Sequence, residues 1–582
     1  MSVQITLVYN RSNPFGIRAD AELLEAAIQA YNREKGITFA KVRHADILEP
    51  PSPTDICIHL EIPATTWMPW SRRNLFMVNA EWYVPAWDCI LPRFDEVLLK
   101  IKDQRDLSGT YIPWRASVAP SDFSKYPQRT TPKSCLWLLG GSKNKRDAAA
   151  AVLPLWQPEW PPVDVYTTST LDLSGAVLGE GVTVHVQDLA QEERHRLQSL
   201  FPVHLCLSRS EGFGLAAAEA EAAGAFIILN DIAAYKSAFE GHQNVGWVNT
   251  EKMCDTKYTR AEFANFSEST TTQLAAIFAG FGILDIPLIR SEQTSRSHER
   301  MDTFTKAINT LLKSHVDAVR AMPAAGPLPP PLSFAECPPI SVVTLTYNRR
   351  KFIDVAFHNL IMTDYPKDKI EWVIVDDSDD PDQAVADKIN KFANRAPVAQ
   401  VQYVPLPNRY TVGGKRNIGV QRASHDIILF MDDDDHYPET SFRRRVGWLT
   451  QHPWKPQVVA CSTIACYDLV RGVSAVNTPP WELGPASRVS EATLTFYKSF
   501  WDTHRFPFTN TSEGEGFLAG NEHVLLDIPP QQILVAFSHQ GNASGRRIPS
   551  GPDTKPGCFF GFPKEYLVWI HKLAGIEVEE EN

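Results

Sequence analysis

A proline-rich stretch near the middle of this 582-residue chain limits what it can fold into more than any other feature. Residues 322–332 contain five prolines, and Pro338 and Pro339 follow shortly afterwards. Proline fixes φ and has no amide hydrogen, so this stretch can form neither a helix nor an inner strand, and we expect an extended spacer. We therefore predict a linker at 322–339 between parts with separate cores, and the length favours three or four domains in all.

Before the linker, short apolar runs alternate with helical patterns, which is typical of parallel sheets with crossover helices. The predicted strands are 4–9, 56–60, 75–78, 96–99, 135–139, 163–166, 182–186, 203–207 and 226–229. A polar, proline-bearing tract at 117–133 is expected to join two Rossmann-like domains, at 1–120 and 121–321. A helix over roughly 292–314 ends this half of the chain.

After the linker, strands and helices alternate again. The predicted order is strand 340–346, helix 349–361, strand 371–375, helix 382–393, strand 400–404, helix 414–423 and strand 426–431. This order is typical of one doubly wound unit, which we place in a domain at 340–582. The predicted fold class is therefore α/β throughout.

Composition limits the class of protein. The net charge of −11 gives no global basic field, so nucleic acid is not an expected partner. The nine cysteines are scattered without CxxC pairs, which is typical of reduced thiols. The N-terminus lacks a signal-peptide pattern, and no segment approaches the ~20 apolar residues that cross a bilayer. We expect a cytoplasmic protein without a transmembrane segment.

Polar clusters follow three strands of the predicted C-terminal sheet, at the edge where open parallel sheets bind ligands. These clusters are Tyr347-Asn348-Arg349, Asp376-Asp377-Ser378 and Asp432-Asp433-Asp434-Asp435-His436. Four consecutive aspartates would repel one another strongly without a cation or a solvent exit. Mg²⁺ and Mn²⁺ accept carboxylate oxygens and bridge to substrate phosphates. On extended backbone, alternate residues share a side, so Asp432 and Asp434 are the predicted metal pair, with a solvated acidic loop as the alternative.

Four motifs in this domain resemble those of family 2-type glycosyltransferases, which have the GT-A fold. They are T-Y-N-R at 346–349, V-I-V-D-D-S at 373–378, G-G-K-R-N-I-G at 413–419 and F-M-D-D-D-D at 430–435. The resemblance implies a nucleotide-diphospho-sugar donor, with UDP favoured because Asp376 would lie near the base. It implies that Asp432 and Asp434 form the metal-binding DxD motif. The residues it places around the donor are Tyr347, Arg349, Asp376, Asp377, Lys415 and Arg416; for Lys415 and Arg416 a surface helix face is the alternative.

The resemblance also implies a carboxylate base on the acceptor side. Deprotonating an acceptor hydroxyl while the sugar leaves the diphosphate needs a positioned carboxylate, which matches an inverting displacement. The candidates are Glu513 and Glu515, because a Glu-Gly-Glu sequence replaces the family's usual Glu-Asp pair. We favour Glu515; a capping or solvated glutamate is the alternative for each. In the segment 539–547, His539 would be a third metal ligand and Arg546 or Arg547 would contact the diphosphate.

A second pattern lies in the N-terminal half. The predicted strand 203–207 leads into S-R-S-E-G-F-G at 208–214 and then into a helix at 215–223, closed by Gly224. Gly212 and Gly214 let the backbone approach a ligand, and a helix N-terminus attracts phosphate. Glu219 would hold ribose hydroxyls and Glu211 would meet the sugar.

The spacing of Glu211 and Glu219 resembles the E-x7-E segment of family 4-type glycosyltransferases, which have the GT-B fold and generally need no metal. The resemblance makes 121–321 the nucleotide-sugar side and 1–120 the acceptor side. It also implies that a basic residue after strand 135–139 binds the diphosphate, and we favour Lys143 over Lys145 and Arg146.

The first hypothesis is a bifunctional glycosyltransferase that uses nucleotide-diphospho-sugar donors and a glycan or glycoconjugate acceptor. Its C-terminal site would be metal-dependent and inverting, and its N-terminal site metal-independent. The alternative is one active GT-A transferase with a non-catalytic GT-B-like module, because 1–120 is short for an acceptor domain. A nucleotidyltransferase is disfavoured because the sequence after strand 340–346 lacks the glycine-rich loop such enzymes carry.

Overall fold

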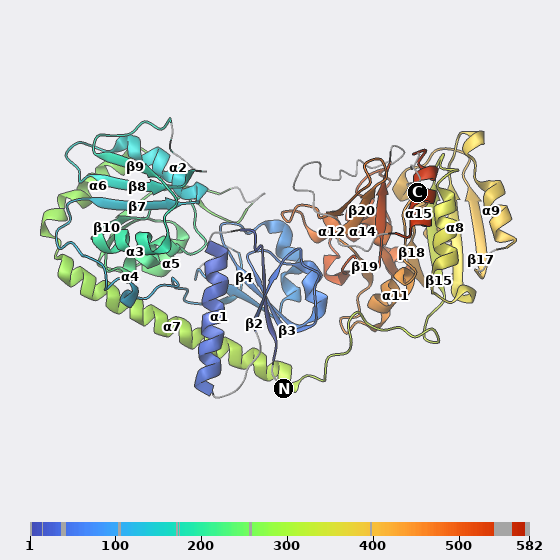
Figure 1. Cartoon of the computed structure of the whole chain (residues 1–582), viewed down its shortest axis with the longest axis horizontal. Coiled ribbons are helices and arrows are strands. Elements are labelled where there is room, and N and C mark those ends of the chain that lie inside the picture. The colour runs from blue at the N-terminus through green and yellow to red at the C-terminus, as the bar shows by residue number, and fades with distance from the viewer. Residues whose placement is uncertain are drawn as a thin grey trace. The chain divides into compact units, whose positions relative to one another are not determined.

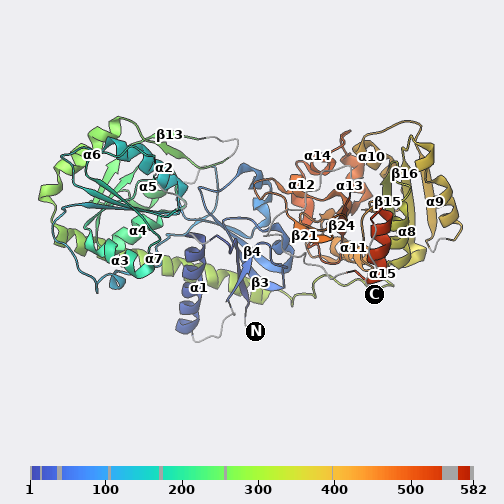
Figure 2. The ribbon, with the colours of Figure 1, turned by 45° about the horizontal axis from the view of Figure 1, so that its top comes forward.

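The computed structural model describes residues 3–13, 16–35, 42–102, 106–169, 173, 175–254, 259–395, 398–539 and 562–576. The chain forms two compact units (Figures 1 and 2). The first comprises residues 1–49, 54–64 and 71–323, and the second comprises residues 50–53, 65–70 and 324–582. Both are α/β in class, as predicted.

The first unit contains two six-stranded sheets, whose strands run parallel to their neighbours. The first sheet has the order β2-β1-β3-β4-β5-β6, and the second has the order β12-β11-β10-β7-β8-β9. The strands are β1 (Ile5–Tyr9), β2 (Val42–Asp46), β3 (Thr54–Leu60), β4 (Ser71–Val78), β5 (Glu96–Leu99), β6 (Thr110–Tyr111), β7 (Cys135–Gly140), β8 (Val163–Thr167), β9 (Val182–Val186), β10 (Val203–Leu205), β11 (Phe226–Asn230) and β12 (Val245–Val248). A separate antiparallel pair is β13 (Glu251–Met253) with β14 (Phe263–Asn265).

Helices cover these sheets. They are α1 (Gly16–Lys35), α2 (Lys143–Val152), α3 (Gln191–Leu200), α4 (Leu215–Ala222), α5 (Ala233–Phe239), α6 (Ser269–Ala279) and α7 (Ile286–Ala321). The long helix α7 packs against both α1 and α4 (Figure 1). Among the described helices none alone has the length and apolar character to span a membrane; only the bent pair Ser269–Ile283 and Ile286–Ala321 has both, when its two members are taken together.

The second unit is built on a seven-stranded mixed sheet with the order β17-β16-β15-β18-β22-β19-β23, beside a smaller sheet β21-β20-β24. The strands are β15 (Ile340–Thr346), β16 (Ile370–Asp376), β17 (Gln400–Pro405), β18 (Ile427–Phe430), β19 (Val458–Ala460), β20 (Ile464–Asp468), β21 (Val473–Asn477), β22 (Thr495–Tyr497), β23 (Leu525–Asp527) and β24 (Val535–Ser538). The helices are α8 (Ile353–Met362), α9 (Ala386–Ala393), α10 (Val412–Arg422), α11 (Ser441–Gln451), α12 (Pro485–Arg488), α13 (Lys498–Thr503), α14 (Glu513–Leu518) and α15 (Lys564–Leu573).

Where elements were predicted, most differences concern their ends and the edge strands; no elements were predicted for residues 440–582, which form β19–β24 and several helices. The helix expected from residue 349 begins at Ile353, because a turn closed by the Phe352 amide and the Arg349 carbonyl (3.0 Å) precedes it. The strands β2, β6 and β12 were not predicted. The first is polar and largely half-buried, the second has only two residues, and the third contains a glycine, so none carries a strong apolar signal.

The second unit includes a short helix from early in the sequence, η1 (Thr65–Trp70). The Thr65 hydroxyl donates to the Asp527 carboxylate at the end of β23. The Trp70 ring lies 5.7 Å from that of Trp448 in α11, and Trp67 is fully buried. Folding of this unit therefore uses residues far upstream of the linker.

Candidate functional site

Strand register brings the polar clusters of the second unit together. The strand β15 lies between β16 and β18 and runs parallel to both, with Thr346 opposite Asp376 and Val343 opposite Phe430. The carboxyl ends of all three strands therefore meet at one edge of the sheet. Asp376, Asp377 and Asp432–Asp435 follow these ends, as the sequence predicted.

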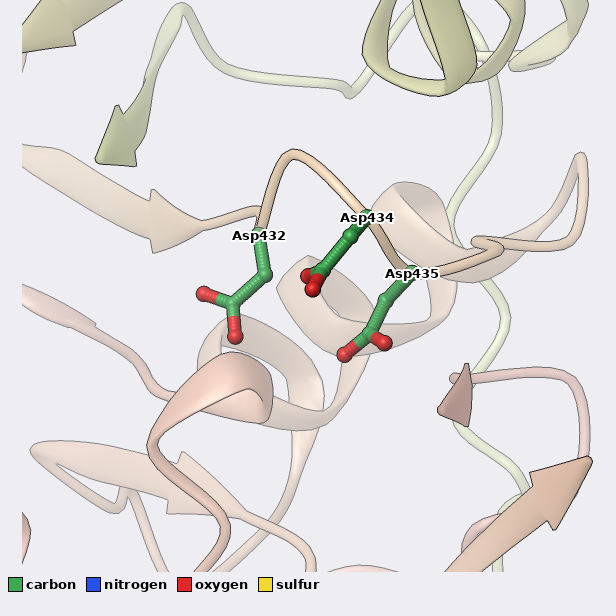
Figure 3. Close-up of side chains that lie close together, drawn as sticks. All are labelled: Asp432, Asp434 and Asp435. Atoms are coloured by element: carbon green, nitrogen blue, oxygen red, sulfur yellow. The ribbon is translucent and has the colours of Figure 1, made fainter. Parts of the chain in front are cut away.

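Three of the four aspartates form a carboxylate cluster. Carboxylate oxygens of Asp432, Asp434 and Asp435 lie within 4.8 Å of one another (Figure 3). Asp434 and Asp435 are almost completely buried, and an Asp435 oxygen accepts the Phe537 amide at 3.0 Å. This donor set suits a hard divalent cation.

The sequence did not predict Asp435 as a member of this cluster. The prediction assumed extended backbone, on which only alternate residues share a side. The chain instead turns at residues 433 and 434, so that Asp435 faces the same point as Asp432. Had a turn been predicted directly after the strand, before His436, Asp435 would have been included in the predicted cluster.

Arg349 partly neutralises the aspartates. Its guanidinium donates to Asp433 at 2.9 Å and to Asp434. Burial opposes the charge of this arginine, but Asp434 and Asp433 outweigh burial and raise its pKa. Burial also raises the pKa of Asp433 to about 6, against the effect of Arg349. Arg349 thus holds both aspartates of the turn that follows β18.

His539, the predicted third metal ligand, lies beside this cluster. Its Nε2 is 3.1 Å from an Asp434 carboxylate oxygen, and the Phe352 ring stacks on the imidazole with centroids 4.0 Å apart. The imidazole is nearly buried. Its role as a ligand stays a prediction, and Arg546 lies outside the described residues.

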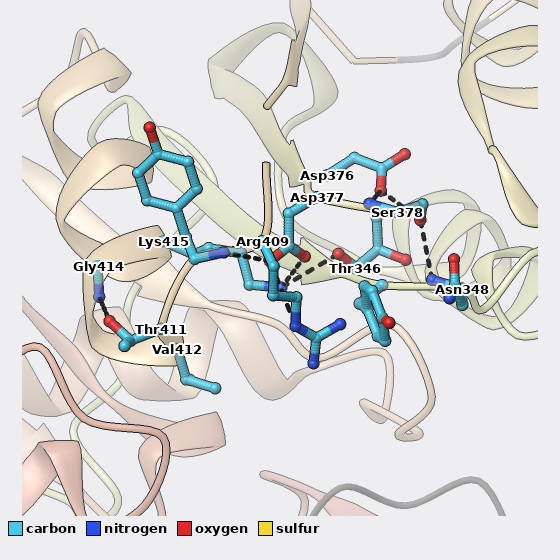
Figure 4. A network of polar contacts seen from close by, with 12 residues as sticks. Thr346, Asn348, Asp376, Asp377, Ser378, Arg409, Thr411, Val412, Gly414 and Lys415 are labelled. Carbon is cyan, nitrogen blue, oxygen red and sulfur yellow. Dashed lines mark hydrogen bonds and ion pairs between the residues drawn. The ribbon is translucent and has the colours of Figure 1, made fainter. Parts of the chain in front are cut away.

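A second network begins one strand away (Figure 4). Asp376 accepts hydrogen bonds from the Tyr403 hydroxyl at 2.7 Å and from the Ser378 hydroxyl at 2.6 Å. Asp377 accepts from the Lys415 ammonium at 2.6 Å, and the same ammonium donates to the Thr346 carbonyl at 3.2 Å. Both charged partners are nearly inaccessible to solvent.

Lys415 therefore belongs to this sheet edge and does not lie on a surface helix face. Its pKa is lowered by burial, which exceeds the opposing effect of Asp377. The helix α10 that carries it is capped by Thr411, whose hydroxyl accepts the Gly414 amide at 3.1 Å. The cap and the ion pair fix the ammonium at the carboxyl end of the sheet.

The loop before α10 adds an arginine that the sequence did not single out. The Arg409 guanidinium lies 3.0 Å over the ring of Tyr347, a predicted donor residue, and 3.8 Å from the Asp377 carboxylate. The Tyr347 hydroxyl donates to Asp379 at 3.0 Å. More than half of the Arg409 side chain is exposed, so its cation faces solvent at the rim of the network.

The two predicted bases, Glu513 and Glu515, lie in different environments. Glu513 accepts from Arg416 at 2.9 Å in a buried ion pair, and the Arg416 guanidinium also covers the Phe430 ring. Glu515 is exposed and accepts the Ser487 hydroxyl at 2.8 Å. One candidate is held by a cation and the other points to the surface.

The first unit brings Glu211 together with other polar groups. The Lys145 ammonium lies 3.6 Å from Glu211, whereas Lys143 is exposed in the first turn of α2. Glu81 lies nearby, and burial, followed by the charges of Glu211 and Glu61, raises its pKa. This group of acids around one lysine is a polar site in the unit.

The predicted glycines make close contacts at this site. A Cβ on Gly212 would lie 1.4 Å from the Asn79 amide oxygen, and Gly214 has a φ of +98° against the ring of Tyr235. Glycine is therefore required at both positions. Glu219 accepts from Gln198 at 2.9 Å and lies 3.9 Å from Arg194, one helical turn beyond the loop.

Comparison with protein families gives a match within the second unit. The model of a family described as "Glycosyl transferase family 2" matches residues 341–494. TarS of Staphylococcus aureus, a poly(ribitol-phosphate) beta-N-acetylglucosaminyltransferase, is 29% identical over 113 residues, which are 19% of this chain and 19% of the relative. The UDP-forming cellulose synthase catalytic subunit of Komagataeibacter sucrofermentans is 25% identical over 145 residues, which are 25% of this chain and 18% of the relative. The matched parts thus span about a fifth of the length of these relatives.

Two solved structures are similar at low identity. Residues 1–349 of S. aureus TarS in complex with UDP-GlcNAc give a TM-score of 0.27 at 18% identity, covering 35% of this chain and 60% of that one. The mannosyltransferase PcManGT from Pyrobaculum calidifontis, in complex with GDP-Man and Mn²⁺, gives 0.29 at 18% identity, covering 39% of this chain and 63% of that one.

Proposed function

Since the second unit carries a glycosyl transferase family 2 domain, as its motifs predicted, we propose that it transfers a sugar from a nucleotide-diphospho-sugar to a hydroxyl of a glycan or glycoconjugate acceptor. The observation that carries this proposal is the meeting of two networks at one sheet edge. The carboxylate cluster of Asp432, Asp434 and Asp435 suits the cation that accompanies a diphosphate. The Asp377–Lys415 pair lies beside it, where the nucleoside would bind.

UDP is the proposed nucleotide. The name of one curated relative describes it as UDP-forming. In this chain, Asp376 is held by Tyr403 and Ser378 at the end of β16, where the family 2 resemblance places the base.

The proposed resident cation is Mg²⁺ or Mn²⁺, held by Asp432, Asp434 and Asp435 with His539 alongside. When bound, such an ion neutralises charge that develops on the departing diphosphate. The chain itself orients the ligands: Arg349 fixes Asp434, the Phe537 amide fixes Asp435, and Phe352 fixes the His539 ring. A screen of nucleotide-sugars for hydrolysis, run with and without EDTA, tests both donor and cation; no turnover of any donor would contradict the proposal.

Replacing Lys415 with methionine is expected to weaken donor binding about tenfold and to lower the free energy of unfolding by about 3 kcal/mol, because it leaves the buried Asp377 carboxylate without its cation. The matched control is Lys388→Met, which breaks a more exposed pair with Asp354 and is expected to cost at most about 1 kcal/mol. Urea unfolding and calorimetric titration with UDP measure the two effects. Equal costs for the two variants would contradict this role of Lys415.

We also propose a second transferase site, independent of metal, in the first unit. It is supported by Glu211 beside Lys145, by the tight backbone at Gly212 and Gly214, and by the helix α4 that follows them. The alternative remains a unit that binds glycan without catalysis. The expectation of a cytoplasmic protein likewise stays a prediction.

Glu211→Gln separates these alternatives. If the first unit is a transferase, this variant is expected to lose one activity by about 10²-fold or more, because a sugar contact made in the transition state is removed, while the metal-dependent activity is unchanged. Assays of two donor activities on the same preparation measure the effect. Glu251→Gln, an exposed substitution in β13, is the matched control. Full activity of Glu211→Gln with every donor would favour the non-catalytic module.

A further inference from the structure

A third glutamate lies next to the two that the sequence offered as bases. Glu491 begins η9 (Glu491–Thr493), the short helix before β22. Its Oε1 accepts the Gly514 amide at 3.2 Å. A Cβ on Gly514 would lie 3.0 Å from Glu491 Cγ and 3.1 Å from Oε1. The Glu491 carboxylate thus occupies the space that a side chain at position 514 would need, between Glu513 and Glu515.

Glu491 is tied to the carboxylate cluster through neighbouring groups. The Tyr437 hydroxyl donates to the Ala492 carbonyl at 3.0 Å and accepts the Asp432 amide at 2.9 Å. One side chain therefore fixes the start of η9 relative to the acidic turn. Glu491 and the proposed cation ligands share one rigid support.

Arg416 links the same groups electrostatically. Glu513, Asp432 and Glu491 all favour its charge and, together, outweigh burial, so its pKa is raised. Its Nε is paired with Glu513, whereas its buried Nη1 has no hydrogen-bond partner among the described residues.

The charge state of Glu491 suits proton transfer. Among the described residues, no ion pair within 4.0 Å involves Glu491. Glu513, in contrast, is paired with Arg416 at 2.9 Å. Burial raises the pKa of Glu491, the charge of Glu513 on α14 raises it further, and Arg416 on α10 opposes both. A carboxylate with a raised pKa is a stronger base than one locked to a cation.

We propose that Glu491 is the catalytic base of the second unit, and that Gly514 provides the room for it; this rests on the transfer reaction proposed above. In the step, the acceptor hydroxyl oxygen forms a bond to the anomeric carbon of the donor sugar. The bond from that carbon to the diphosphate oxygen breaks, and its electron pair leaves with the diphosphate. The hydroxyl proton moves to the Glu491 carboxylate.

Glu491→Gln is expected to lower kcat for transfer by about 10²- to 10⁴-fold, because the amide keeps the shape and the contact with the Gly514 amide but cannot take the proton. Donor affinity is expected to stay within about threefold, because no donor contact is removed. Glu482→Gln, a change at an exposed glutamate of the same unit, is the matched control and should leave kcat within about threefold.

The pH dependence and a second variant complete the test. In the unaltered protein kcat should rise as pH increases through the pKa of Glu491, since only the ionised form accepts a proton, and Glu491→Gln should lose this rise. Gly514→Ala should displace the carboxylate and lower kcat with little effect on donor affinity. The inference is overturned if Glu491→Gln retains kcat and the rise, or if Glu515→Gln, at the base favoured from the sequence, loses them instead. If the unaltered protein turns over no donor, the proposed function fails instead.

Discussion

Asparagine in place of Asp434 is expected to lower sugar transfer by the second unit about 10³-fold, with the loss in kcat and in cation affinity. Asp434 is the aspartate that joins the groups of this site, since it belongs to the carboxylate cluster and also contacts Arg349 and His539. Removing its charge takes away one ligand and leaves Arg349 with one fewer partner. Losing such a group at the point where charge develops on the diphosphate typically costs this much.

The measurement is kcat as a function of Mn²⁺ or Mg²⁺ concentration, together with calorimetric titration of each ion. Asp382→Asn is the matched control, because Asp382 is an exposed aspartate of the same unit outside the cluster. Activity of Asp434→Asn within about threefold of the unaltered protein, at every cation concentration, would show that the cluster does not serve the reaction.

Alanine in place of Trp67 is expected to destabilise the second unit by about 3–5 kcal/mol, because a large, fully buried ring is removed and a cavity remains. This is a large share of the ~5–15 kcal/mol that stabilises a typical domain. The effect should appear in residues more than two hundred positions away in sequence, since η1 contacts β23.

Hydrogen exchange resolved by peptide is the suitable measurement. Faster exchange is expected in β23 and α11 of the Trp67→Ala variant, where Asp527 and Trp448 contact η1, and unchanged exchange in β7. The matched control is Trp82→Ala, which removes a ring that is 58% exposed and should change stability by less than about 0.5 kcal/mol. If exchange in β23 stays unchanged in Trp67→Ala, η1 does not contribute to the second unit's stability.

The part of the second unit up to β18 was predictable because its strands are buried on both faces of the sheet, whereas no elements were predicted after residue 440. The strands β15, β16 and β18 are continuous apolar runs that end in polar clusters, and parallel strands place those clusters at one edge. The resemblance to family 2-type transferases then supplied the DxD motif, which the family match supports. Strand end and motif together were sufficient to place Asp432 and Asp434 at this edge, where their carboxylates cluster; their binding of a metal ion stays a prediction.

Residues that depend on tertiary contacts were not predictable in the same way. Glu491 lies more than twenty residues before Glu513, and only the folded chain brings it over Gly514. The basic residues of the first unit show a similar limit. Ser142 caps α2 by accepting the Lys145 amide, and this local geometry leaves Lys143 exposed while Lys145 lies near Glu211. Composition and spacing carry no information about such rotations.

The short helix η1 also bears on how such a protein can be divided or recombined. The predicted linker at 322–339 would be the obvious place to divide the chain in order to replace one unit by another. A gene fragment that begins there would nevertheless encode an incomplete second unit, because residues 65–70 would be left behind. A protease that cuts only within 322–339 would produce two chains, both of which contribute residues to the folded second unit. The second unit can therefore be exchanged or purified separately only if residues 65–70, which form η1, are included with it.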